Sequence, residues 1–152
     1  MKEKLWWFIV KFLLISFPLF ALWYWKGQDQ YLVLLNYALT FLLIKIAGFK
    51  IEYFPAPKDI FNNLIPFVSL MIITRGIKLK TRVIWLVWGL LILIAWHMIL
   101  TEVVYLLGVD SPTYEKFSVP LYLFSETLPF FLWILIARKQ VAGLFFRGKE
   151  AG

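Results

Sequence analysis

Long uninterrupted blocks of apolar residues constrain this chain more than any other feature of its sequence. The first block, Leu5 to Trp25, reads LWWFIVKFLLISFPLFALWYW, and a helix needs about 20 such residues to cross a bilayer. Over the whole chain, 62% of the residues are hydrophobic and only 16% are charged. One small soluble core cannot bury that much apolar surface. The sequence therefore predicts an integral membrane protein.

The pattern within the blocks indicates helices. Their apolar residues follow one another continuously, whereas the strands of a membrane β-barrel alternate apolar and polar residues. We expect an all-α, polytopic transmembrane helix bundle that forms a single domain over residues 1–152. Its five spans should cover about residues 5–25, 31–49, 60–74, 83–108 and 117–137. The first two spans should form an antiparallel hairpin around a polar turn at residues 26–30.

The third block is ambiguous. Ile60 to Thr74 has only 15 residues and contains Pro66, so four spans plus one re-entrant helix are the alternative. Counting Lys and Arg favours four spans. The charges buried within blocks favour five spans, because that topology puts Lys11 in the same membrane half as Glu102 and Glu126.

Charge predicts the orientation. Residues 75–82 carry four basic side chains and no acidic one, and basic loops remain on the cytoplasmic side of a membrane. We expect a multi-pass protein of the cell inner (plasma) membrane with this loop and the C-terminus in the cytoplasm. The net charge of +7 lies beside apolar segments, which points to lipid headgroups and not to nucleic acid.

Several classes of function are excluded or disfavoured by composition. The chain has no cysteine, which excludes disulfides, thiolate metal sites and cysteine nucleophiles. The longest polar loops run to about ten residues, whereas an independent domain needs about 50 or more. Any chemistry must therefore take place within the bilayer, and the expected partners are the lipid bilayer and other membrane proteins.

Polar side chains inside the apolar blocks are the candidate functional residues, because each is costly in hydrocarbon unless it pairs or faces a cavity. A single histidine matches no helix-borne metal signature, so we assign no metal ligand, cofactor or catalytic residue. We expect a buried polar network that ties helices together. Its candidate members are Lys11, Asn62, Asn63, His97, Thr101, Glu102 and Glu126.

Two of these positions allow local predictions. Asn62 and Asn63 begin the short third block, where they either cap its helix or hydrogen-bond to other helices; capping is the commoner use. Pro129 should free one backbone carbonyl of the last span and bend that helix, with Ser125 or Thr127 available to satisfy such a group.

The order of elements resembles the core of the exosortase/archaeosortase family and its small associated membrane proteins, over roughly residues 42–107. The resemblance is carried by Ala47-Gly48-Phe49, the segment KIEYFPAPKD, a helix beginning at Phe61-Asn62-Asn63, a basic loop ending in Lys80-Thr81-Arg82, and a long helix containing Gly89. It implies that the segment KIEYFPAPKD lies outside the cytoplasm, which favours five spans.

The family's enzymes are membrane cysteine transpeptidases that process C-terminal sorting tails. The resemblance implies a catalytic cysteine at the position of Asn62-Asn63, an arginine between residues 83 and 108, and a histidine after His97, and this sequence has none of the three. It therefore implies a noncatalytic integral membrane subunit or accessory protein of an envelope protein-sorting or export system. The alternative is an intramembrane enzyme or a small proton or solute transporter that uses Glu102, Glu126 and His97.

Overall fold

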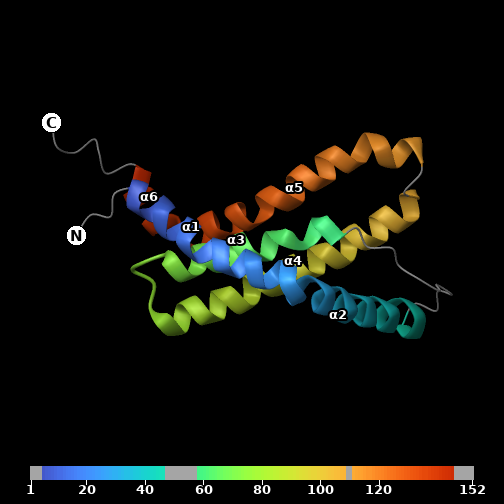
Figure 1. The fold of residues 1–152 in the computed structure, drawn as a ribbon, viewed down its shortest axis with the longest axis horizontal. Helices are drawn as coiled ribbons and strands as arrows, with labels where there is room; N and C mark the ends of the chain where they lie inside the picture. The colour runs from blue at the N-terminus through green and yellow to red at the C-terminus, as the bar shows by residue number, and fades with distance from the viewer. Residues whose placement is uncertain (1–4, 47–57, 109–110, 146–152) are drawn as a thin grey trace.

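The computed structural model describes residues 5–46, 58–108 and 111–145 (Figure 1). Within these ranges the chain is helical and contains no strand, which confirms the all-α prediction. Three helical stretches are long and apolar enough to cross a membrane, Leu5–Thr40, Leu79–Val104 and Pro112–Ile136, and Phe61–Ile73 is a shorter apolar helix.

The first two predicted spans are one continuous helical stretch. It consists of α1 (Leu5–Leu22), the π-helical turn η1 (Trp23–Gly27), α2 (Gln28–Thr40) and the π-helical turn η2 (Phe41–Ile46). Gly27 and Gln28 both have right-handed helical dihedral angles, so the predicted turn at residues 26–30 and the antiparallel hairpin are wrong. A polar segment without proline does not by itself end a helix, and Lys and Gln have high helix propensities.

A short helix occupies the centre of the bundle. The 3₁₀ helix η3 (Lys58–Asn63) leads into α3 (Leu64–Ile73), which packs against α1, α4 (Leu79–Leu107) and α5 (Pro112–Ile136) (Figure 1). Eight of the ten α3 residues are buried. The block that was ambiguous as a membrane span is therefore the helix around which the others pack.

Close approach of α3 and α4 depends on Gly89. The ring of Phe67, which has no exposed surface, lies where a β-carbon on Gly89 would have to be. Small residues at such crossings let helices pack tightly in membrane proteins, where the hydrophobic effect does not drive helix association.

The helices run alternately along the long axis of the molecule (Figure 1). The beginning of α1, the loop between α3 and α4, and α6 (Arg138–Phe145) lie at one end. We call residues 74–82 and 137–145 the basic end, because they carry six cationic side chains and no acidic one: Arg75, Lys78, Lys80, Arg82, Arg138 and Lys139.

Candidate functional site

A chain of hydrogen bonds joins four helical elements in the interior. The Tyr31 hydroxyl on α2 lies 2.6 Å from His97 Nδ1 on α4, and His97 Nε2 lies 2.8 Å from Asn63 Oδ1. Asn63 Nδ2 then donates to the backbone carbonyl of Ser125 on α5 at 2.9 Å and faces the Ser125 hydroxyl at 3.1 Å. His97 and Asn63 have no exposed surface. We call Tyr31, Asn63, His97 and Ser125 the central network.

The direction of each hydrogen bond in the central network follows from one carbonyl. The Ser125 carbonyl can only accept, so the amide nitrogen of Asn63 must face it and Asn63 Oδ1 must face His97. His97 Nε2 therefore donates, and in the neutral ring Nδ1 accepts from Tyr31. With this assignment both nitrogens of His97 and both ends of the Asn63 amide have partners.

The carbonyl at the end of this chain is the one that Pro129 frees. A proline within a helix removes the hydrogen bond to the carbonyl four residues earlier, which here belongs to Ser125. This carbonyl accepts a hydrogen bond from Asn63, which lies on another helical element. Thr127, the other predicted donor, bonds the carbonyls of Leu123 and Phe124 instead.

Both asparagines connect helices, and Asn63 does not cap. Asn63 occupies the N-cap position of α3, but its side chain makes no capping hydrogen bond, so the capping interpretation is wrong for it. Asn62 accepts from Trp23 Nε1 at 3.1 Å and donates to the Tyr24 hydroxyl at 2.9 Å. The start of the third block is therefore anchored to the π-helical turn η1 and to the central network.

The structure brings together some of the other predicted residues and separates the rest. Thr101 is buried and donates to the His97 carbonyl at 2.8 Å. Glu102, the residue after Thr101 on α4, is half-buried. Glu126, the residue after Ser125 on α5, is exposed. Lys11 is half-buried on α1, with its Nζ 5.7 Å from the centre of the Trp7 ring.

Lys11 and Glu102 lie at different depths in the bundle. The hydrogen-bonded pair Asn63 and His97 marks one level of the bundle. Glu102 lies five residues beyond His97 on one side of that level, and Leu70, which lines a groove with the neighbours of Lys11, lies seven residues from Asn63 on the other side. At a rise of 1.5 Å per residue, these twelve residues separate Glu102 from the level of Lys11 by about 18 Å. The grouping of Lys11 with Glu102, which favoured five spans, has no support in this arrangement.

Tyr31 is the network residue that the sequence argument missed. Tyr31 is 9% exposed, and its ring packs edge-on against those of His97 and Phe61. Its spacing offered a signal, since Gln28, Tyr31, Leu35 and Leu39 recur every three or four residues, as the buried positions of a helix do, and all four are buried.

A second set of polar contacts closes the C-terminal end of α3. Arg82 of α4 donates to the carbonyls of Ile72 at 3.2 Å and Thr74 at 2.6 Å. Trp133 Nε1 of α5 donates to the Thr74 hydroxyl at 2.8 Å. The last carbonyls of a helix lack intrahelical donors, so these side chains hold α3 between α4 and α5 at the basic end.

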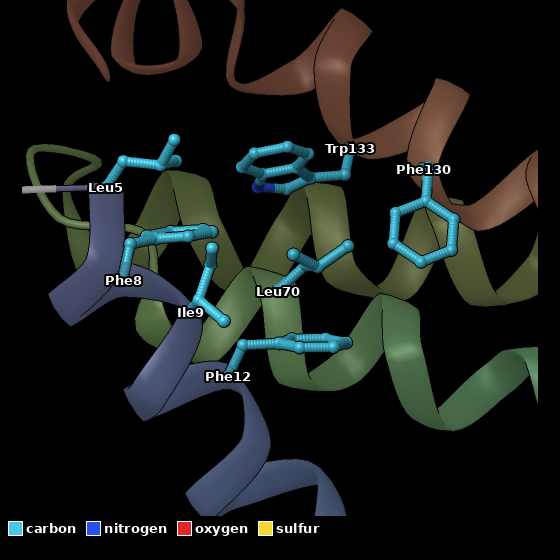
Figure 2. Close-up of a pocket in the computed structure, with 7 residues that line it drawn as sticks. All are labelled: Leu5, Phe8, Ile9, Phe12, Leu70, Phe130 and Trp133. Carbon is cyan, nitrogen blue, oxygen red and sulfur yellow. The ribbon is translucent and has the colours of Figure 1, made fainter. Parts of the chain in front are cut away.

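Two of the hollows on the surface of the described residues bear on the functional question. An apolar groove of about 350 Å³ lies between α1, α3 and α5 (Figure 2), where the rings of Phe8 and Trp133 stack with their centres 5.6 Å apart. A cavity of about 300 Å³ lies at the basic end and includes Lys78, Arg138 and Lys139 in its lining. Neither is lined by a residue of the central network. The described ranges contain no group of three acidic or histidine side chains placed to hold a metal ion.

Comparison with protein-family models, curated proteins and solved structures found no match for this chain.

Proposed function

We propose that this protein is a noncatalytic subunit or accessory protein of a larger complex in the inner (plasma) membrane. The observation that supports this proposal is that the buried polar side chains of the central network hydrogen-bond to one another. His97 and Asn63 have no exposed surface, and their side-chain nitrogen and oxygen atoms all hydrogen-bond within the protein. A group that binds substrate or relays protons needs access to a ligand or to water, and His97 and Asn63 have no surface exposed to either. Its geometry suits the joining of helices.

The length of the first helical stretch supports a specific contact surface. At 1.5 Å per residue, Leu5–Thr40 extends about 54 Å, whereas the hydrocarbon core of a bilayer is about 30 Å thick. A straight crossing by α1 would thus leave α2 beyond the core with an apolar face exposed. Val33, Leu34 and Tyr37 are between 56% and 73% exposed on α2. We propose that a membrane-associated partner protein covers this face.

The same continuity favours a topology of four passes over the predicted five. The passes are the stretch from α1 to η2, η3 with α3, α4, and α5. In this topology the beginning of α1, the basic loop 75–82 and α6 share one side of the membrane, which the positive-inside rule makes the cytoplasmic side. The resemblance to exosortase-associated proteins suggests an envelope protein-sorting or export system as the setting.

Site-specific photocrosslinking in cells tests the subunit proposal. A photoreactive residue at Val33 or Tyr37 should crosslink to one discrete larger membrane protein, identifiable by mass spectrometry. The matched control is Val87 or Leu91 on α4, which are 50% exposed and should crosslink to lipid. Crosslinks from α2 only to lipid, or only to a second copy of this chain, would contradict the proposal.

The enzyme and transporter alternatives make an opposite prediction about the glutamates. A reaction or a proton pathway through Glu102 and Glu126 would be lost in Glu102→Gln and Glu126→Gln, whatever the partner. If both variants still crosslink through Tyr37 and still support the partner's activity, the noncatalytic role stands. Loss of that activity with the crosslink preserved would favour the alternatives.

A further inference from the structure

The cavity at the basic end combines cationic, hydrogen-bonding and apolar walls. It has a volume of about 300 Å³ and lies between the α3–α4 loop, the first turns of α4, and the junction of α5 with α6. Its walls are of two kinds. The polar ones are Lys78, Thr81, Arg138, Lys139 and Gln140, and the larger apolar ones are Ile77, Trp85 and Ile136.

The loop between α3 and α4 forms part of the cavity wall. Gly76 has a φ of 84°, a conformation that strongly favours glycine, and turns the chain toward α4. The side chain of Gln140 lies near this glycine, since a β-carbon built there would be 3.7 Å from Gln140 Nε2. Lys78 of the loop and Arg138 and Lys139 of α6 line the same cavity.

The cations of the cavity are available to a ligand. Arg82 is engaged by the carbonyls at the end of α3 and does not line the cavity. Lys78, Arg138 and Lys139 make no side-chain hydrogen bond or ion pair with the described part of the chain, and residues 74–82 and 137–145 contain no acidic side chain. Three positive charges around one small cavity favour an anion, and phosphate groups are well suited to Lys and Arg donors.

An exposed apolar stripe leads away from the cavity along α4. Thr81 and Trp85 line the cavity, and Trp88 and Ile92 follow at spacings of three and four residues, which keeps all four on one helix face. Trp85, Trp88 and Ile92 are 46%, 58% and 46% exposed. Tryptophan commonly lies at the boundary between headgroups and hydrocarbon. A free phosphate would leave this stripe uncovered, whereas a phospholipid would cover it with an acyl chain.

We propose that the cavity is a binding site for the phosphate headgroup of an anionic phospholipid, with an acyl chain lying along the α4 stripe. Lys78, Arg138 and Lys139 would neutralise the phosphate, and Thr81 and Gln140 would hydrogen-bond to it or to the glycerol oxygens. Basic pockets between membrane helices on the cytoplasmic side are suited to such headgroups. The proposal depends on the membrane location of the chain but not on the subunit role.

Native mass spectrometry of the full chain in a neutral detergent tests this site. Phosphatidylglycerol is the anionic probe and phosphatidylcholine the zwitterionic comparison. The site variant is Lys78→Gln/Arg138→Gln, and the matched control is Arg75→Gln/Lys80→Gln, which removes the same charge from the same end but outside the cavity. At about 1 kcal/mol for each basic residue, the site variant should lose about 10- to 30-fold in phosphatidylglycerol affinity. The control should lose less than about threefold.

The outcomes separate a built site from general attraction between charges. One tightly bound phosphatidylglycerol per chain, weakened only in the site variant, supports the proposal. Equal weakening in both variants, or equal binding of phosphatidylcholine, overturns it. Displacement of the lipid by inorganic phosphate or glycerol 3-phosphate at millimolar concentration also overturns it, in favour of a soluble phosphate ester. Unchanged thermal unfolding of both variants verifies folding, and the crosslinking through α2 tests the subunit role separately.

Discussion

Asn63 is the side chain of the central network that links α4 to α5. It receives a hydrogen bond from His97 and supplies the donor for the carbonyl that Pro129 leaves open. Hydrogen bonds between membrane helices contribute about 0.6 kcal/mol on average, but a buried polar group left without a partner costs about 1–3 kcal/mol. The importance of Asn63 therefore comes from what its removal would leave unsatisfied.

Replacement of Asn63 by alanine should lower the free energy of unfolding by about 2–3 kcal/mol, because it strands His97 Nε2 and the Ser125 carbonyl. Reversible unfolding in detergent micelles measures this change. The matched control is Asn62→Ala, whose partners Trp23 and Tyr24 are only partly buried or exposed, and which should cost about 1 kcal/mol or less. Equal losses in the two variants would contradict the central role of Asn63.

The coupling between Asn63 and Pro129 gives a second prediction. In Pro129→Ala the backbone N–H of residue 129 regains the Ser125 carbonyl, so the carbonyl no longer depends on Asn63. A double-mutant cycle should find Asn63→Ala less damaging in the Pro129→Ala background by about 1 kcal/mol. Strict additivity would mean that the proline and the asparagine act independently.

Among the elements, α3 decides the packing. It is short and almost wholly buried, and the same two helices hold both of its ends. Asn63 bonds to α4 and α5 at its start, and Arg82 of α4 and Trp133 of α5 bond to its C-terminal end. Its middle is close to α4 because Gly89 has no side chain. Proline at position 66 is tolerated because it lies in the first turn of α3, where backbone N–H groups have no intrahelical partner.

A methyl group at Gly89 should disrupt this crossing. Gly89→Ala would overlap the Phe67 ring, and overpacking of a tight core costs about 1–3 kcal/mol. Ala95→Val enlarges a side chain on an exposed face of the same helix and should change stability by less than about 0.5 kcal/mol. Thermal unfolding of both variants makes the comparison, and restored stability in Gly89→Ala/Phe67→Leu would show that the ring is the obstacle.

For the whole molecule, the continuity of α1 with α2 is the basis of the proposed four-pass topology. It reverses the side on which the N-terminal end of α1 should lie, relative to the five-span prediction. The basic loop and α6 are then joined at one end by the start of α1 (Figure 1). Whether the chain crosses the membrane in four passes or five is thus a question about residues 26–30.

Single cysteines in this cysteine-free chain make that question measurable. With an impermeant maleimide in intact cells, Ser111→Cys should label, whereas Leu5→Cys, Lys78→Cys and Gln140→Cys should label only in inverted vesicles. Labelling of Leu5→Cys together with Ser111→Cys in intact cells would restore the hairpin and the five spans. Lys78→Cys and Gln140→Cys are protected in both topologies and serve as internal controls.

The sequence alone determined the properties that depend on composition and on local bonding. Long apolar blocks require helices in a bilayer, the cluster at residues 75–82 marks one end, and Pro129 must free a carbonyl wherever the helix packs. Tertiary structure decided which faces meet. Whether residues 26–30 turn or remain helical depends on what packs against them. Asn63 hydrogen-bonds to Ser125 instead of capping α3 because α5 lies within reach of its side chain. Likewise, Tyr31 belongs to the central network only because α4 brings His97 within hydrogen-bond distance of its hydroxyl.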